Sequence, residues 1–339
     1  MSPSLPAHSV TTVRILLSGL AIESLQAEIG RVMGSRSFEL VSMESAVLHR
    51  RQDIDIALIT RDVTGLSTKH ELAPALQACY DVLSHCRHLQ WIHIHSAGSD
   101  RPIYVELRQR GVVVTTSSGT NAEVVTQTAL AGLLSLARGF PRLLAAQRNH
   151  TWAPLIKTGL PKDLTGQTAV VVGWGPIGQK ISLVLHALGV KVIAVRRSCI
   201  PSPPAIETVA YENLMTVLPR TDWLLLACPL STQTRGLVSA AAFDCMPSGA
   251  QLVNVARGEV VDEAALISAL QSGRLAGAYL DVFAHEPLAP ESPLWDMPNV
   301  IVTPHSAGFS DGNARRVVQL FLDNLGRWLK REALFPQAT

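Results

Sequence analysis

The stretch TAVVVGWGPIG, residues 168–178, joins an apolar run to a closely spaced set of glycines. Residues 177–188 then carry apolar side chains at helical spacing, so the stretch predicts a strand, a tight turn and a helix in that order. This order, with the spacing G-x-G-x-x-G, is typical of a dinucleotide site whose phosphates lie at the start of the helix. The alternative is a glycine-rich turn in an ordinary α/β domain, and the flanking strand and helix favour the dinucleotide site. The predicted phosphate contacts are Gly173, Gly175, Pro176, Ile177 and Gly178.

The next apolar run of this region, VIAVRRS at 192–198, ends in two arginines. In a dinucleotide-binding unit an acidic residue is expected about 20 positions after the glycines, where it binds the ribose 2′-hydroxyl of NAD. An acid would repel a 2′-phosphate, whereas arginine binds a phosphate through paired, charge-assisted hydrogen bonds. Arg196, Arg197 and Ser198 therefore predict NADP as the preferred cofactor, with NAD as the second choice. A solvated pair of arginines at a strand end is the alternative.

Apolar runs alternate with helical patterns along the chain, which predicts βα units and parallel sheets. A long apolar helix at 121–139 separates two such series, and an amphipathic helix is predicted at 313–329. The expected strands are 13–19, 38–43, 55–60, 91–98 and 112–117 in the first series, and 168–175, 191–197, 222–228, 250–257, 276–283 and 300–308 in the second. We predict an α/β protein with a substrate-binding domain, 1–120 with 309–339, and a dinucleotide-binding domain, 121–308.

The composition of the 339 residues argues against several classes of protein. Hydrophobic residues make up 47% and charged residues 17%, which suits packed cores rather than disorder. The net charge of +2, without a long basic run, argues against a nucleic-acid partner. We expect no membrane span and no signal peptide, because the apolar stretches are short and residues 1–13 lack the required pattern. Five scattered cysteines without a CxxC pair favour a cytoplasmic protein with no metal site.

Three apolar runs of the second series are followed by residues with catalytic potential, namely Arg257, Glu286 and His305. Ligands of open α/β sheets bind beyond the carboxyl ends of the strands, so we expect the three side chains to face the nicotinamide. Reduction of a 2-oxo acid needs a cation for the substrate, which Arg257 supplies, and a proton donor, for which His305 is suited. Glu286, if it contacts His305, would favour the protonated imidazole. Each residue alone has a structural alternative: His305 could be a surface or hydrogen-bonded histidine, Arg257 could cap a strand end, and Glu286 could lie in a solvated turn. The presence of all three behind a nucleotide-binding motif favours catalysis.

From about residue 91 onward, the chain resembles the D-isomer-specific 2-hydroxyacid dehydrogenases. The matching stretches are HSAGSD (95–100), GTNAEVV (119–125), GWGPIG (173–178), CPLSTQTRGLV (228–238), NVARGEVVDEAAL (254–266), LDVFAHEPL (280–288) and TPHSAG (303–308). The resemblance implies two doubly wound parallel-sheet domains, a Rossmann domain inserted in a flavodoxin-like substrate domain, and a homodimer built around the helix near 121–139. The arginine pair and EPLAPESPLW at 286–295 look most like the glyoxylate and hydroxypyruvate reductase branch.

The resemblance also implies roles for individual residues. Arg257, Glu286 and His305 would be the catalytic set, and the backbone at Ala97, Gly98 and Ser99 would hold the substrate carboxylate together with Arg257. The further cofactor contacts implied are Cys228, Pro229, Thr234, Val255, Ala256, Asp281, His305 and Gly308. The chain departs from the family at Ser99, where many members have an apolar residue, and at Thr126-Gln127, where alanine and glutamate are frequent. These departures bear on substrate selectivity.

The predicted function is NADPH-dependent reduction of a small 2-oxo acid, such as glyoxylate or hydroxypyruvate, to the D-2-hydroxy acid. His305 would donate the proton, Glu286 would tune His305, and Arg257 would bind the carboxylate and carbonyl. A nucleotide-sensing interaction protein of the same fold is an alternative, since the family includes transcriptional corepressors. Oxidation of formate or phosphite is a weaker one. Formate dehydrogenases of this superfamily carry glutamine where Glu286 stands, which argues against formate, whereas the three residues alone do not exclude phosphite.

Overall fold

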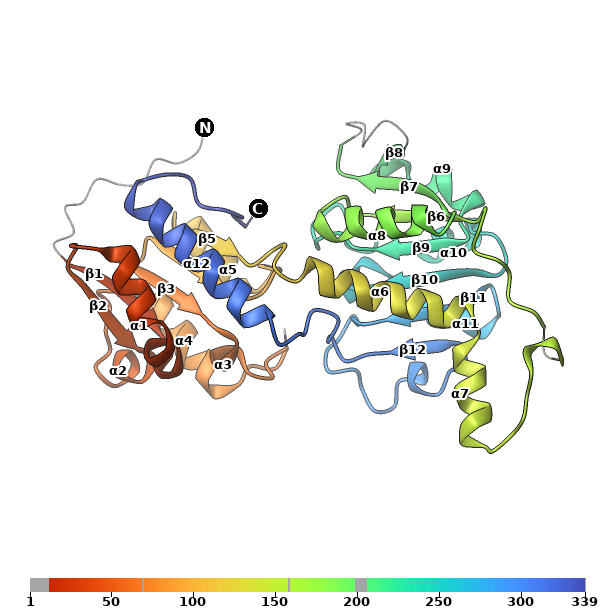
Figure 1. Ribbon diagram of the computed structural model, residues 1–339, viewed down its shortest axis with the longest axis horizontal. Helices are drawn as coiled ribbons and strands as arrows, with labels where there is room; N and C mark the ends of the chain where they lie inside the picture. Colours follow the sequence, from red (N-terminus) through yellow and green to blue (C-terminus); the bar gives the residue numbers. More distant parts are fainter. Residues whose placement is uncertain (1–11, 69, 158, 199–205, 339) are drawn as a thin grey trace. The chain divides into compact units, whose positions relative to one another are not determined.

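The computed structural model describes residues 12–68, 70–157, 159–198 and 206–338. These residues form two compact units, each built on its own parallel sheet (Figure 1). Unit 1 contains the described residues up to Thr120 and those from Ser310 onward, and unit 2 contains Asn121–Phe309. Of the five cysteines, Cys199 lies outside the described residues.

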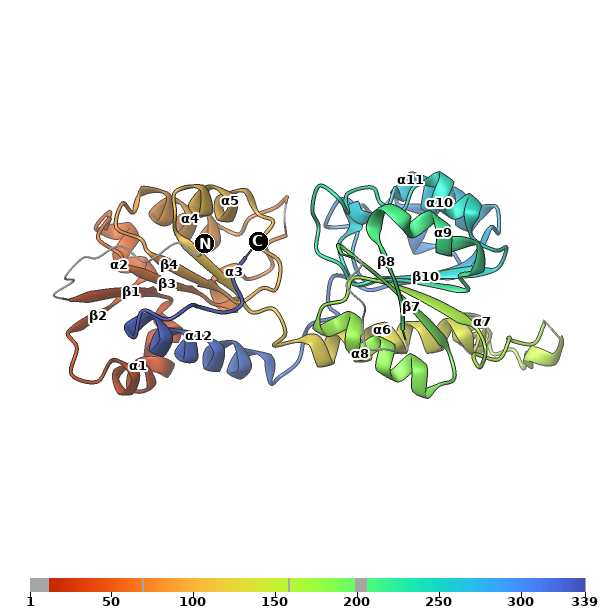
Figure 2. The same cartoon turned by 90° about the horizontal axis from the view of Figure 1, so that it is seen from above.

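The sheet of unit 1, in the part of the chain that is described, has five parallel strands in the order β2-β1-β3-β4-β5. The strands are β1 (Val13–Leu17), β2 (Phe38–Ser42), β3 (Ile56–Ile59), β4 (Trp91–Ile94) and β5 (Val113–Thr116). The helices are α1 (Gly19–Met33), α2 (Met43–Leu48), α3 (Arg61–Thr64), α4 (Pro74–His85), α5 (Pro102–Gln109) and α12 (Asn313–Leu329). Figure 2 shows α1 and α12 on one face of the sheet and α4 and α5 on the other. This strand order confirms the predicted flavodoxin-like fold.

The amphipathic helix predicted at 313–329 is α12, which begins and ends at those residues. Its apolar face packs on the sheet of unit 1 through Val317, Phe321, Leu325 and Trp328, the residues of one helical stripe. Phe321 is fully buried, and its ring stacks on that of Trp91 in β4 with the ring centroids 5.3 Å apart. α12 is therefore a component of the core of unit 1, although it is distant from β4 in sequence.

A buried histidine lies in the core of unit 1. The Nδ1 atom of His93 in β4 is 2.8 Å from Thr115 Oγ1, and its Nε2 atom is 3.1 Å from Ser117 Oγ. Ser117 donates to the carbonyl of Ile94, so its oxygen is free to accept the proton on Nε2. Burial lowers the pKa of His93 to about 3. The ring is therefore neutral in the folded protein at neutral pH.

We expect His93 to make unit 1 less stable in mild acid. In the unfolded chain a histidine titrates near 6.5, so between pH 6.5 and 3 the unfolded state binds a proton that the folded state does not. Stability that is present above pH 6.5 is therefore lost as the pH falls, by about 2 kcal/mol between pH 7 and 5. Hydrogen exchange of the β4 amides, corrected for intrinsic rates, measures this loss. The loss should shrink in His93→Gln and persist in His49→Gln, whose side chain is exposed. Equal losses in both variants would contradict the assignment.

The sheet of unit 2 has, among the described residues, seven parallel strands in the order β12-β11-β10-β9-β6-β7-β8. The strands are β6 (Thr168–Val172), β7 (Lys191–Arg196), β8 (Glu207–Ala210), β9 (Trp223–Leu226), β10 (Ala250–Asn254), β11 (Leu275–Leu280) and β12 (Val300–Val302). The order confirms the predicted Rossmann fold, with β6 in the interior of the sheet between β9 and β7. The edge strand β8 was not among the predicted strands. It is short and has only the neighbour β7, so its sequence carries little apolar pattern.

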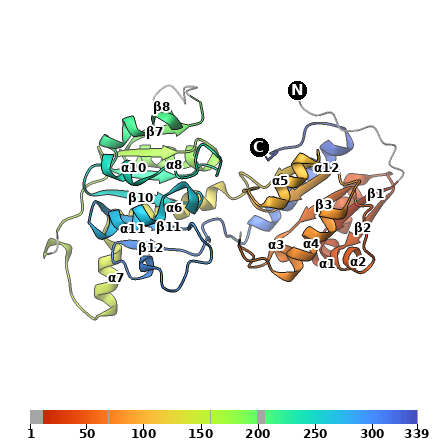
Figure 3. The same cartoon turned by 180° about the vertical axis from the view of Figure 1, so that it is seen from behind.

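Helices cover both faces of the sheet of unit 2. The helices are α6 (Ala122–Ala137), α7 (Phe140–Arg148), α8 (Pro176–Ala187), α9 (Leu214–Val217), α10 (Ala240–Cys245) and α11 (Glu263–Gln271). α6 and α8 pack on one face, and Figure 3 shows α10 and α11 in front of the other. No single helix among the described residues is long and apolar enough to span a membrane; α6 and α7 meet that criterion only as a pair bent by 74°.

Candidate active site

The three predicted catalytic residues follow three neighbouring strands of unit 2. Arg257 follows β10, Glu286 follows β11 and His305 follows β12. Because these strands are parallel and adjacent, their carboxyl ends lie at the same edge of the sheet. The positive charges of His305 and Arg257 both act on the Glu286 carboxylate. The fold therefore brings together three side chains that are far apart in the sequence.

Glu286 and His305 form a hydrogen-bonded pair, with 2.8 Å between Glu286 Oε2 and His305 Nδ1. The Glu286 side chain is 12% exposed and its other oxygen accepts the backbone N–H of Phe283, whereas the His305 side chain is 46% exposed. Burial alone would raise the pKa of Glu286, but the contact with His305, the Phe283 amide and the charge of Arg257 outweigh burial and lower the pKa. Glu286 is therefore a carboxylate at neutral pH, and it leaves His305 Nε2 as the outward-facing nitrogen.

Asp281 fixes the loop that carries His305. Its carboxylate is buried and accepts hydrogen bonds from the Thr303 hydroxyl and from the backbone N–H groups of Ser306 and Ala307. The N–H of His305 donates to the carbonyl of Asp281 at 2.8 Å. These contacts hold His305 at a φ of +50°, a left-handed conformation that is uncommon for residues other than glycine. The resemblance assigned Asp281 to the cofactor, and the contacts in this structure are with the His305 loop.

Asn254 and Gly258 shape the turn that carries Arg257. The buried Asn254 side chain accepts the N–H of Ala256 and donates to the carbonyl of Arg257. A Cβ atom on Gly258 would lie 1.8 Å from the backbone of Phe283, so only glycine fits where this turn passes the β11 loop. Asn254 and Gly258 stand within the NVARG stretch, but their part in fixing the Arg257 backbone was not predicted from the sequence.

The glycine turn after β6 has the shape that a dinucleotide phosphate group requires. Gly173 has a φ of +104°, and a Cβ atom there would lie 2.6 Å from the backbone of Ala227. A Cβ atom on Gly178 would lie 2.0 Å from the Gly173 carbonyl oxygen, so the helix packs closely on the turn. At Gly175, the residue before α8, no atom of the described residues other than its two chain neighbours comes within 4 Å of the Cβ position. Pro176 opens α8 at a position where proline is tolerated, and Ile177 follows it. The turn therefore fits a pyrophosphate at the helix N-terminus.

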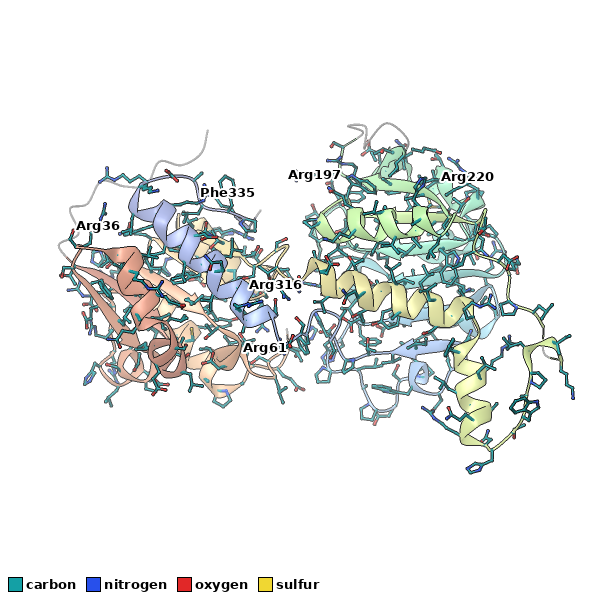
Figure 4. All side chains as sticks on the ribbon, in the orientation of Figure 1. Arg36, Arg61, Arg197, Arg220, Arg316 and Phe335 are labelled. Carbon is teal, nitrogen blue, oxygen red and sulfur yellow. The ribbon has the colours of Figure 1, made fainter. Side chains whose placement is uncertain are left out.

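The arginine pair lies at the end of β7. Arg196 is the last residue of the strand and is partly exposed, and Arg197 after it is exposed. Figure 4 shows Arg197 and Arg220 at opposite ends of the sheet of unit 2. Arg220 forms an ion pair with Glu207, the first residue of β8. The predicted cations for a 2′-phosphate thus stand at the same end of the sheet as the glycine turn.

The remaining predicted cofactor contacts of unit 2 lie in the loops after β9, β10 and β12. Cys228, Val255 and Ala256 are buried, Pro229 is exposed, and Gly308 is partly exposed. Burial raises the pKa of the Cys228 thiol to about 12, so the thiol is not a nucleophile at neutral pH. The buried Thr234 hydroxyl donates to the carbonyl of Pro229 and accepts the N–H of Ser231. Thr234 therefore closes its own loop through this hydroxyl.

The predicted carboxylate-binding loop belongs to unit 1 and follows β4. Ala97 is exposed, while Gly98 and Ser99 are partly exposed. The Ser96 hydroxyl donates to the carbonyl of Gly98 at 2.8 Å and thereby closes the turn. Ser99, one of the departures from the family pattern, accepts a hydrogen bond from Arg108. His95 contacts Thr64 at 2.9 Å, and burial, with the charges of Arg61 and Arg101, lowers its pKa to about 4.

The chain matches a known family over more than half of its length. The model of the NAD-binding domain of D-isomer specific 2-hydroxyacid dehydrogenases matches residues 130–307. The chain is 32% identical over 241 residues to a glyoxylate reductase of Korarchaeum cryptofilum, which covers 68% of this chain and 70% of that protein. It is 28% identical over 254 residues to a glyoxylate/hydroxypyruvate reductase of Arabidopsis thaliana, covering 75% and 77%.

The fold matches a solved structure over nearly the whole chain. That structure is a D-isomer specific 2-hydroxyacid dehydrogenase from Xanthobacter autotrophicus Py2, in complex with NADPH and MES. The TM-score is 0.75 at 26% identity, and the match covers 97% of this chain and 98% of the other. The chain therefore belongs to the D-isomer-specific 2-hydroxyacid dehydrogenases, oxidoreductases that act on small 2-oxo and 2-hydroxy acids with a nicotinamide dinucleotide.

Proposed function

We propose that this protein reduces a small 2-oxo acid, such as glyoxylate or hydroxypyruvate, to the D-2-hydroxy acid with NADPH. The observation that carries the proposal is the hydrogen bond between Glu286 and His305, 2.8 Å long, at the sheet edge that also bears Arg257. The names of the relatives support the choice of substrates. Unit 2 is proposed as the dinucleotide-binding domain and unit 1 as the substrate-binding domain, where Ala97, Gly98 and Ser99 bind the carboxylate.

In the proposed mechanism, the bound cofactor supplies the hydride that reduces the keto carbon. Arg257 binds the substrate carboxylate and stabilises the negative charge that develops on the carbonyl oxygen. His305 protonates that oxygen through Nε2, because Nδ1 is held by Glu286. The Glu286 carboxylate stabilises the imidazolium before the proton is given up and keeps the ring in one orientation. In the oxidative direction His305 accepts the same proton.

Cofactor choice is the first test of this proposal. Purified protein should reduce glyoxylate or hydroxypyruvate with a kcat/KM for NADPH about tenfold or more above that for NADH, a difference of about 1.4 kcal/mol. Arg196→Ala and Arg197→Ala should each lower this ratio, because each removes a cation from the end of β7. Arg220→Ala, at the other end of the sheet, should leave the ratio unchanged. Tight NADPH binding without turnover of any 2-oxo acid would instead favour the sensing protein.

We also propose that the protein is a cytoplasmic homodimer. The helix near 121–139, around which we expected the dimer, is α6, and its buried residues pack in the core of unit 2. We therefore propose that a second copy covers α7, which follows α6, and the segment after it. α7 has no buried residue, and Phe140, Leu144, Trp152 and Ile156 expose large apolar side chains over this region. Trp152 is 93% exposed. Light scattering should give twice the chain mass of 36.5 kDa. Phe140→Asp with Ile156→Asp should shift the mass towards the monomer, and a monomeric wild type would refute the dimer.

A further inference from the structure

Tyr211 lies next to the arginine pair although it is distant from it in sequence. β7 and β8 pair in parallel, with Val195 opposite Val209 and Arg196 opposite Ala210. Tyr211 directly follows Ala210, so it stands beside Arg197, the residue that directly follows Arg196. The pairing of an edge strand thus brings a phenol to the place where the 2′-phosphate is expected.

The packing shows which face of the sheet Tyr211 occupies. Ile193 and Val195 of β7 belong to the core cluster under α10 and α11, and Val209 and Tyr211 pack against the same cluster. Val192 packs in the cluster on the opposite face, under α6 and α8. Arg197 and Tyr211 each lie one residue beyond their strands, Tyr211 at the start of a 3-10 helix, and of the two arginine charges that act on the Tyr211 hydroxyl that of Arg197 is the stronger.

The surroundings of the Tyr211 hydroxyl suit a hydrogen-bond donor to an anion. Burial and the neighbouring Cys228 raise the pKa of Tyr211 to about 12, while the charges of Arg197 and, more weakly, Arg196 oppose the rise. The hydroxyl is therefore protonated at neutral pH and lies within the field of both arginines. The ring packs on the core cluster, which limits the positions open to the hydroxyl. Because Cys228 acts on the Tyr211 hydroxyl, the hydroxyl lies near the loop after β9, which contains Cys228 and is predicted to line the adenosine.

We propose that Tyr211 belongs to the 2′-phosphate site and donates a hydrogen bond to the phosphate that Arg197 binds. The proposal rests on the proposed preference for NADPH and adds a residue that determines it. A phosphate oxygen accepts from the neutral phenol and from the guanidinium together, whereas the 2′-hydroxyl of NAD offers no charge to either group. Tyr211 therefore contributes to the binding of NADP and little to that of NAD.

The test uses fragments of the cofactor, so its readout does not depend on turnover. Isothermal titration calorimetry with the full chain compares 2′,5′-ADP, which carries the 2′-phosphate, with 5′-AMP, which lacks it. We expect the wild type to bind 2′,5′-ADP at least about tenfold more tightly. Tyr211→Phe should raise the dissociation constant of 2′,5′-ADP by about five- to tenfold and change that of 5′-AMP by less than about twofold. Tyr80→Phe is the matched control, since it removes a hydroxyl that belongs to unit 1, where it donates to the hydroxyl of Tyr104 at 3.1 Å.

The outcomes separate this inference from the function on which it rests. A Tyr211→Phe variant that keeps the full preference for 2′,5′-ADP would overturn the role of Tyr211 and leave the NADPH proposal standing. Equally weaker binding of both fragments to Tyr211→Phe would also overturn the role of Tyr211 in the 2′-phosphate site, since Tyr211 would then shape the adenosine site in general. A wild type that binds the two fragments equally would overturn both proposals. The variant keeps the aromatic ring, and its melting temperature and circular dichroism confirm that it folds.

Discussion

Replacement of His305 by asparagine is expected to lower kcat for 2-oxo acid reduction by about 10²–10⁴-fold, the usual contribution of a positioned general acid. Asparagine cannot deliver a proton to the developing alkoxide, although it retains a side chain that can hydrogen-bond to Glu286. The measurement is the steady-state rate at saturating NADPH and substrate. NADPH affinity, measured by fluorescence titration, should change far less than kcat, because the glycine turn after β6 is untouched and His305 is only one of the expected cofactor contacts.

His285→Asn is the matched control for this prediction. His285 belongs to the same DVFAHEP stretch as Glu286 and is exposed, but it is not part of the Glu286–His305 pair. Its substitution should leave kcat within about twofold of the wild type, as expected for a surface change. Wild-type turnover by His305→Asn, or an equal loss in both variants, would refute the role of His305 as the proton donor.

Replacement of Arg257 by glutamine is expected to lower kcat/KM by about 10²–10³-fold, comparable to the loss of one donor that stabilises a developing oxyanion. The turn that carries Arg257 is fixed by Asn254 and by the close passage of Gly258 past Phe283, so neighbouring side chains cannot take its place. Arg257→Lys should recover only part of the loss, since an ammonium group cannot bind a carboxylate in the two-pronged way. The measurement is kcat/KM for glyoxylate at saturating NADPH.

Arg220→Gln provides the control for the loss of an arginine from unit 2. Arg220 pairs with Glu207 at the end of the sheet opposite the carboxyl ends of the strands (Figure 4). An exposed ion pair contributes at most about 1 kcal/mol to stability, so this variant should fold and keep its activity. If Arg257→Gln reduced glyoxylate as well as Arg220→Gln does, Arg257 would not be the substrate-binding cation.

The positions of most strands along the chain and the turn at 173–178 could be predicted because both depend on local patterns. Apolar runs of parallel strands are nearly continuous, and the spacing of glycines reports where the backbone bends or approaches another segment. The edge strand β8 could not be predicted this way, since ETVA gains its structure from the open edge of β7 rather than from its own apolar pattern. The same pairing brings Tyr211 beside Arg197, which no spacing in the sequence indicates.

In the candidate active site too, the residue types could be predicted from the sequence, whereas the contacts between strands could not. Arg257, Glu286 and His305 were proposed as catalytic residues from their positions after apolar runs and from their chemistry. The sequence did not indicate that Asp281 would accept three donors from the His305 loop, or that Thr303 would lie between Asp281 and the Tyr279 hydroxyl. Those hydrogen bonds depend on the register of β11 and β12, in which Leu280 pairs with Val302.

The sequence by itself determined the two βα series, the glycine turn after β6, the cationic end of β7 and the residue types of the proposed catalytic set. These properties follow from short-range periodicity and backbone sterics, which act within a few residues of the chain. Only the tertiary structure decided that Glu286 contacts His305, that Asp281 holds the His305 loop and that Tyr211 stands beside Arg197. Each of these contacts joins different strands, and strand pairing is set by the packing of the whole sheet.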